Sequence, residues 1–167
     1  MLYVLIFLVI LAGDQALKWW TVGNLALYES TPLLPGIVEL RYIQNTGGGW
    51  SILSEHTWLL SLLTAIIVAV LCILMLCRIV RHPIGMTACT FLAAGGAGNL
   101  MDRVRLGYVV DMFHFEFWPS YPVFNIADIF VVVGMILAAV YYLFLYDKYD
   151  APKKESQDGA DHSSDDK

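Results

Sequence analysis

The chain has 167 residues, of which 58% are hydrophobic and only 15% are charged, and its mean hydropathy is +0.63. An average soluble domain is about 45–50% apolar and about 25% charged, so this composition indicates a single-domain integral membrane protein. Residues 147–167 hold seven acidic and four basic residues and carry most of the formal net charge of −5, which leaves no strongly basic surface for nucleic acid.

The apolar run of residues 2–20 predicts the first membrane-spanning helix, because a bilayer core requires about 20 helical residues. No basic segment precedes it and no small-residue cleavage site follows it, so we interpret it as a retained helix rather than a cleaved signal peptide. Asp14 and Lys18 are four residues apart, which places them on one helix face where they can pair. Trp19 and Trp20 suit the membrane–water interface.

Residues 21–56 are too polar and too rich in Pro and Gly to span a membrane. Within them, residues 38–42 alternate between apolar and polar side chains, which predicts a β-strand. Residues 45–51 contain three consecutive glycines and predict a loop. This segment is therefore expected to form a small, β-rich cap outside the membrane.

Three more spans are predicted at about residues 57–77, 84–101 and 124–146. The first of these is uncharged, the second is rich in Gly and Ala, which allows close helix approach, and the third contains one charge, Asp128. The predicted fold class is an all-α membrane protein with four transmembrane helices and a β-rich cap. Residues 1–146 form its single membrane-embedded domain, and residues 147–167 are expected to be a disordered acidic tail.

With four spans, the end of the first, the end of the third and the start of the fourth lie at the same membrane face. The polar residues near these ends are therefore expected to lie at that one face. They are Asp14, Asn45, Asn99, Asp102, Arg103, Asp111, Asn125 and Asp128. Five Lys and Arg residues flank the spans on the other face and four flank them on this one. The excess favours termini in the cytoplasm and a site on the outer face.

Asp111 and Asp128 are the strongest candidates for chemistry. A carboxylate inside a membrane segment costs roughly 2.5–3.5 kcal/mol on insertion scales, which favours a functional role for Asp128. Two adjacent carboxyl groups can share one proton, so that one activates water and the other protonates a scissile carbonyl. The alternatives are that Asn125 and Asp128 only cap a helix and that Asp111 is a surface loop residue.

For each of the other polar residues, a functional and a purely structural role are both open. Asn99, Asp102 and Arg103 could orient the carboxyl pair or hold substrate backbone, or Arg103 could anchor at the interface and pair with Asp102. Asp14 and Lys18 could support the site or form only a helix-end ion pair. Cys72, Cys77 and Cys89 lie in apolar runs without metal-ligand spacing, so they are expected only to pack. No metal or other cofactor is expected, because no His or Cys ligand set accompanies the acids and a carboxyl pair can activate water unaided.

Five sequence blocks, in this order between four spans, resemble the bacterial lipoprotein signal peptidase family, also called signal peptidase II. They are D-Q-x-x-K at residues 14–18, N-x-G-x-x-W at 45–50, G-N-x-x-D-R at 98–103, V-V-D ending at Asp111 and F-N-x-A-D ending at Asp128. The chain departs from the family pattern at Ala94, where the family has glycine, and at Gly49 and Trp50, where it has alanine and phenylalanine.

The resemblance implies that Asp111 and Asp128 are catalytic. It implies supporting or substrate-binding roles for Asp14, Asn45, Asn99, Arg103 and Asn125. Lys18 and Asp102, which lie in the same sequence blocks, are further candidates for such a role. The implied protein is a monomeric aspartic endopeptidase of the bacterial inner membrane, in contact with membrane lipid. It would cleave prolipoproteins before a diacylglyceryl-modified cysteine, and an amphipathic helix would accompany its cap.

Two other functions remain open on the residues alone. One is a metal-dependent enzyme acting on lipid headgroups, in which Asp14, Asp102, Asp111 and Asp128 would bind Mg²⁺. The other is a non-enzymatic scaffold or a proton-coupled transporter that uses the same acids as a proton path.

Overall fold

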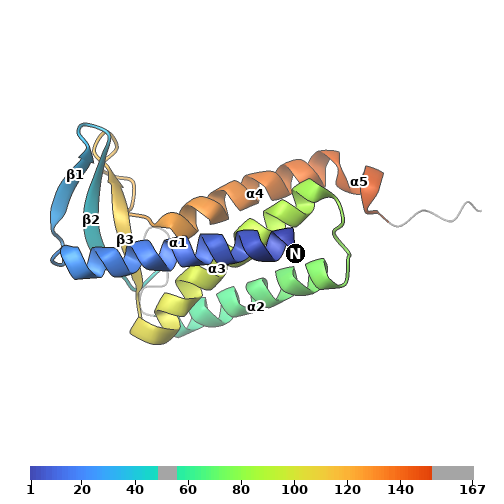
Figure 1. Ribbon diagram of the computed structural model, residues 1–167, viewed down its shortest axis with the longest axis horizontal. Coiled ribbons are helices and arrows are strands. Elements are labelled where there is room, and N and C mark those ends of the chain that lie inside the picture. Colours follow the sequence, from blue (N-terminus) through green and yellow to red (C-terminus); the bar gives the residue numbers. More distant parts are fainter. Residues whose placement is uncertain (49–55, 152–167) are drawn as a thin grey trace, which may run out of the picture.

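Four long helices form the body of the protein in the computed structural model, which describes residues 1–48 and 56–151. They are α1 (Leu2–Asn24), α2 (Thr57–Leu76), α3 (Pro83–Leu106) and α4 (Ile126–Phe144). All four are long and apolar enough to cross a membrane, which confirms the four predicted spans. They run alongside one another, with a small sheet at one end and the short helix α5 (Tyr146–Tyr149) at the other (Figure 1).

Helix α3 is the centre of the bundle and packs against α1, α2 and α4. Half of its most apolar stretch is buried, whereas none of the corresponding stretch of α2 is. Small residues bring α3 and α4 together, since a side chain at Gly95 would collide with the backbone carbonyl of Ala127. Close backbone approach of this kind is how helices associate in lipid, where burial of apolar surface alone contributes little.

The cap is a three-stranded antiparallel sheet in the order β1 (Ser30–Leu34), β2 (Val38–Asn45) and β3 (Val109–Phe115). Strand β2 confirms the strand predicted at residues 38–42 and extends it to Asn45. Strand β1 was not predicted; it contains Pro32, which an edge strand tolerates because one side of it has no ladder partner. Pairing of Ile43 with Asp111 in β3 brings the two extramembrane segments together.

An apolar core joins the sheet to the end of α1. Leu40 and Tyr42 of β2 pack with Val110 and Met112 of β3 and with Leu25, which follows α1. The cap is thus anchored on the helices, and β3 enters it directly from the end of α3. The described residues of the cap side include no amphipathic helix, in contrast to the expectation from the family.

Several predicted boundaries are corrected. Helix α1 continues to Asn24 rather than ending at residue 20, and α3 continues to Leu106 rather than ending at residue 101. Asp102 and Arg103 therefore lie within α3 instead of in the connection after it. The fourth helix begins at Ile126 and ends at Phe144, inside the predicted 124–146. The loop predicted at residues 45–51 is described only as far as Gly48.

The tail also begins later than predicted. Helix α5 occupies Tyr146–Tyr149, and the Asp150 carboxylate accepts hydrogen bonds from the Tyr141 hydroxyl at 2.6 Å and from the backbone N–H groups of Arg81 and His82, each at 3.1 Å. These contacts tie the chain to the α2–α3 turn, so the disorder predicted from residue 147 is wrong for residues 147–151. The rest of the predicted tail, residues 152–167, lies outside the described part.

Candidate active site

Asp111 and Asp128 come from different elements, and Asn125 connects them. Asp111 lies in β3, and Asp128 lies in the first turn of α4. The Asn125 side-chain amide donates to Asp111 Oδ1 at 2.7 Å. The Asn125 side-chain oxygen accepts from the backbone N–H of Asp128 at 2.9 Å, and the backbone N–H of Asn125 donates to Asp128 Oδ2 at 3.1 Å.

This exchange between Asn125 and Asp128 is a capping box, which satisfies free N–H groups at the start of α4. The capping alternative raised by the sequence is therefore correct, but it is not exclusive. The same asparagine that caps the helix also binds Asp111, so the start of α4 is positioned against β3.

Asp111 is almost completely buried, with 2% of its surface exposed. It also accepts a hydrogen bond at 2.9 Å from the side-chain amide of Asn45, at the end of β2. Burial, and then the negative charge of Asp128, raise the pKa of Asp111 to about 7, against the opposing effect of the two amide donors. Near neutral pH this carboxyl group can therefore hold or release a proton.

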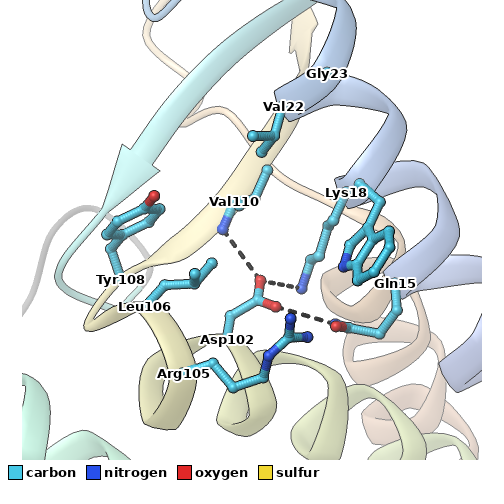
Figure 2. A pocket seen from close by; sticks show the side chains of 10 residues that line it. Gln15, Lys18, Val22, Gly23, Asp102, Arg105, Leu106, Tyr108 and Val110 are labelled. Atoms are coloured by element: carbon cyan, nitrogen blue, oxygen red, sulfur yellow. Dashed lines mark hydrogen bonds and ion pairs between the residues drawn. The ribbon is translucent and has the colours of Figure 1, made fainter.

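A second group of carboxylates surrounds Lys18 of α1. The Lys18 ammonium lies 2.9 Å from an oxygen of Asp14 and 2.9 Å from an oxygen of Asp102, and only 2% of the lysine surface is exposed. The Gln15 amide donates to Asp102 at 3.0 Å and to Asp14 at 3.2 Å. Figure 2 shows Lys18 and Gln15 converging on Asp102 from α1.

These three charged residues, which we call the Lys18 cluster (Asp14, Lys18 and Asp102), join four elements. Asp14 accepts from the backbone N–H of Ala127 in α4 at 2.9 Å, and Asp102 accepts from the backbone N–H of Val110 in β3 at 3.2 Å (Figure 2). The cluster thus fixes the start of α4 and the start of β3 relative to α1 and α3. Those are the two elements that carry Asp128 and Asp111.

Asn99 of α3 links the Lys18 cluster to the carboxyl pair. Its side-chain oxygen accepts from the Lys18 ammonium and from the Asn125 amide, both at 3.0 Å. Its own amide donates to Asp128 Oδ1 at 2.7 Å. The polar residues at this end of the bundle therefore form one continuous network inside otherwise apolar surroundings.

The carboxyl pair opens on a cavity of about 280 Å³, which we call the membrane-side cavity. Asn99, Arg103, Asp111 and Asp128 form its polar wall, and Val131, Val132 and Met135 of α4 form an apolar wall along the helix. Arg103 donates to the backbone carbonyl of Gly47 at 3.0 Å and interacts electrostatically with Asp128 and Asp111.

Eight of the nine predicted site residues are thus connected by hydrogen bonds or ion pairs, and the ninth, Arg103, lines the membrane-side cavity with four of them. The predicted Asp14–Lys18 pair is confirmed. The alternative pairing of Arg103 with Asp102 is wrong, because Asp102 pairs with Lys18 instead. No role was predicted for Gln15, although it belongs to the D-Q-x-x-K block and its position next to Asp14 was a usable signal.

The four aspartates do not converge on one point. Asp14 and Asp102 share Lys18, whereas Asp111 and Asp128 are bound by asparagine amides. Within residues 1–48 and 56–151, no three His, Cys, Asp or Glu side chains are grouped as metal ligands would be.

The known proteins that this chain resembles in sequence belong to one family. The model of the family described as signal peptidase (SPase) II matches residues 6–144. Lipoprotein signal peptidases of Streptococcus pyogenes serotype M2 (strain MGAS10270) and serotype M5 (strain Manfredo) are each 36% identical over 143 residues, covering 83% of this chain and 91% of the relative.

The fold of this chain is also similar to that of solved structures. Two structures described as bacterial membrane enzymes are 28% identical to this chain and superpose with TM-scores of 0.79 and 0.77. They cover 92% and 85% of this chain and 93% and 92% of their own. With a family model over most of its length, close curated relatives and the same fold, the chain belongs to the signal peptidase II family.

Proposed function

We propose that this protein is an aspartic endopeptidase that removes signal peptides from prolipoproteins, cleaving before a diacylglyceryl-modified cysteine. Its relatives are named lipoprotein signal peptidases, which supports the substrate class. The aspartic mechanism rests on one observation. Asp111 and Asp128 share a cavity, are bridged by Asn125 and are each bound by amide groups rather than by a contacting cation.

The two carboxyl groups take complementary roles. Asp111, with its pKa raised to about 7, holds the shared proton at neutral pH and donates it to the scissile carbonyl. Asp128, in the first turn of α4 where the helix dipole favours a negative charge, is the ionised partner that takes a proton from the attacking water. Asn99, Asn125 and Asn45 keep both groups in place, since their amides are themselves held in the network.

The membrane-side cavity suits the signal-peptide part of the substrate. Its apolar wall follows α4 into the membrane from the position of the dyad, so a helical signal peptide can lie against Val131, Val132 and Met135. Arg103 lies at the polar end, where it can bind a backbone carbonyl of the substrate. Acyl chains on the substrate cysteine hold that residue at a fixed depth in the bilayer, at about 0.8 kcal/mol per buried methylene.

The enzyme is placed in the bacterial inner membrane with its active site on the outer side and both termini in the cytoplasm. The α5 end carries Arg78, Arg81 and Lys148, as the positive-inside tendency predicts for a cytoplasmic face. One chain supplies both carboxyl groups, so a monomer suffices. No metal or organic cofactor enters the reaction, because a carboxyl pair can activate water directly.

The decisive experiment is cleavage of a purified lipidated proform by wild-type protein and by Asp111→Asn and Asp128→Asn. Each variant should lose about 10³-fold or more in kcat, since one half of the acid–base pair is removed. Asp147→Asn, an exposed carboxylate at the opposite end, is the matched control and should retain full activity.

Two further arms test the substrate and the chemistry. An unlipidated proform should be cut poorly, and EDTA should not reduce cleavage of the lipidated one. Near-normal turnover by either Asn variant would remove that aspartate from the mechanism. Inhibition by EDTA that Mg²⁺ reverses would instead indicate a metal-dependent enzyme.

A further inference from the structure

A second cavity, of about 380 Å³, lies on the cap side of Asp111. We call it the cap-side cavity. It is bounded by the end of β2, by Asp111 and His114 of β3, and by residues 119–123. It shares Asn45, Asp111 and residues 121–123 with the membrane-side cavity, so Asp111 stands where the two cavities adjoin.

The two cavities differ in chemistry. The membrane-side cavity has Val131, Val132 and Met135 along one wall, whereas the cap-side cavity has Arg41, Thr46, His114 and Ser120 around it. A polypeptide cut at the dyad extends in both directions from the scissile bond. Its apolar signal peptide fits the first cavity, and its hydrophilic mature part, which leaves the membrane, fits the second.

Part of the wall of the cap-side cavity is fixed by a short chain of contacts. His114 lies 2.9 Å from the Glu39 carboxylate through Nδ1, and its Nε2 lies 3.4 Å from the backbone carbonyl of Pro119. These contacts hold the start of the 119–123 segment against β2 and β3. Glu39 is thereby engaged with His114 and is not paired with Arg41, two residues further along the strand.

Arg41 is the unexplained group in this cavity. Its Nε is buried and has no hydrogen-bond partner, and no carboxylate of the described residues lies within 4.0 Å of its guanidinium. Buried polar atoms are nearly always paired. Arg41 as a whole is only half-buried and lines the cavity. A guanidinium in such a position is suited to a ligand that supplies oxygen acceptors, above all a carboxylate.

We propose that the cap-side cavity binds the first residues of the mature part of the substrate, and that Arg41 selects for acidic side chains there. This inference rests on the proposed function and adds a specificity determinant on the far side of the cleaved bond. Arg41 is a specificity residue and not a catalytic one, because the carboxyl pair does not depend on it for any hydrogen bond.

The test uses three lipidated proforms that differ only in the two residues after the modified cysteine, which are Asp-Asp, Asn-Asn or Lys-Lys. For the full-length wild-type enzyme, kcat/KM should be about tenfold higher for Asp-Asp than for Lys-Lys, chiefly through KM, as expected for one charge-assisted contact. Arg41→Gln should bring the three values to within about twofold of one another, and Arg41→Glu should reverse their order.

The ratio between proforms is the readout, because it does not depend on how much of a variant is folded. Arg105→Gln, which removes an arginine from a different cavity, should keep the wild-type ratio. A wild-type ratio near one, or an unchanged ratio in Arg41→Gln, would overturn the inference while leaving the peptidase assignment intact.

The same assay distinguishes two further outcomes from the proposed one. If the effect of Arg41→Gln followed the anionic phospholipid content of the vesicles rather than the charge of the proform, Arg41 would be a lipid-headgroup contact and the inference would be wrong. Failure of the wild-type enzyme to cut any proform would overturn the proposed function and this inference with it.

Discussion

Two pairs of aspartates lie at the same end of the helices and differ in their partners. Asp14 and Asp102 enclose the ammonium of Lys18, each at 2.9 Å. Asp111 and Asp128 are bound by the amides of Asn45, Asn99 and Asn125 and adjoin cavities that a substrate could enter.

The difference shows how one residue type can serve two purposes in one site. The contacting lysine pairs with both carboxylates and, through them, holds α1, α3, α4 and β3 together. Amide donors position a carboxyl group and leave its proton free to move, and a neighbouring negative charge raises its pKa towards neutrality. The Lys18 cluster therefore supports the fold, whereas the amide-bound pair is the one that we propose carries the chemistry.

The largest expected effect comes from breaking the Lys18 cluster. Lys18→Met leaves Asp14 and Asp102 buried without their cation, so the free energy of unfolding should fall by about 3–5 kcal/mol. Thermal unfolding in detergent measures this. Adding Asp14→Asn and Asp102→Asn to Lys18→Met should recover most of the loss, because the uncompensated charges are gone. An unchanged midpoint for Lys18→Met would mean that the cluster does not stabilise the fold.

Asn99 contacts both the Lys18 cluster and the carboxyl pair, so its loss should affect stability and activity together. Asn99→Ala should lower the free energy of unfolding by about 1–3 kcal/mol and kcat/KM by about 10- to 100-fold, as two charged partners lose a hydrogen bond. Asn24→Ala is the control, since its exposed side chain bonds only the carbonyl of Trp20. Loss of stability without loss of activity would separate Asn99 from the carboxyl pair.

A smaller effect is expected from crowding the cluster. A methyl group at Gly98 would lie 2.7 Å from an oxygen of Asp14 and 3.3 Å from the Ala127 side chain. Gly98→Ala should therefore reduce the free energy of unfolding by about 1–3 kcal/mol. Gly13→Ala is the matched control in α1, where nothing lies within 4 Å, and it should be neutral or slightly stabilising. Equal effects of the two substitutions would contradict the close fit around Asp14.

The smallest expected effect is a shift in pH dependence. Below about pH 7 Asp111 is protonated and above it the carboxyl ionises, so kcat/KM should fall as the pH rises through this value. Asn45→Ala removes a donor that lowers the pKa of Asp111, and the fall should move to higher pH. Gln44→Ala, whose side chain bonds the Tyr42 hydroxyl, should leave the profile in place. A profile unaffected by Asn45→Ala would mean that another group controls the alkaline side.

Hydropathy alone located the four spans but did not show which of them is buried or carries the site residues. Helix α2 has the most apolar stretch of the four, and none of that stretch is buried. Helix α3 has the least apolar stretch, and it supplies Asn99, Asp102 and Arg103. Lipid accepts any apolar surface, so a strongly apolar helix can face it, whereas a helix with polar and small residues must be covered by its neighbours.

The amino-acid sequence by itself determined the four spans, one of the three cap strands, the candidate residues and, by span parity, the end of the bundle where they gather. Those properties follow from composition, periodicity and segment length, which act locally along the chain. The i to i+4 spacing also sufficed for the Asp14–Lys18 pair, because helical geometry sets it.

Only the tertiary structure decided which carboxylates share a lysine and which share a cavity. Asp102 lies 84 residues from Lys18 and next to Arg103, yet it pairs with the lysine, because α1 and α3 pack side by side and place the ammonium between two acids. Asp111 lies beside Asn125 because β3 leads back to the start of α4. Such contacts depend on how helices and strands pack over long distances in the chain, and no local pattern of residues encodes them.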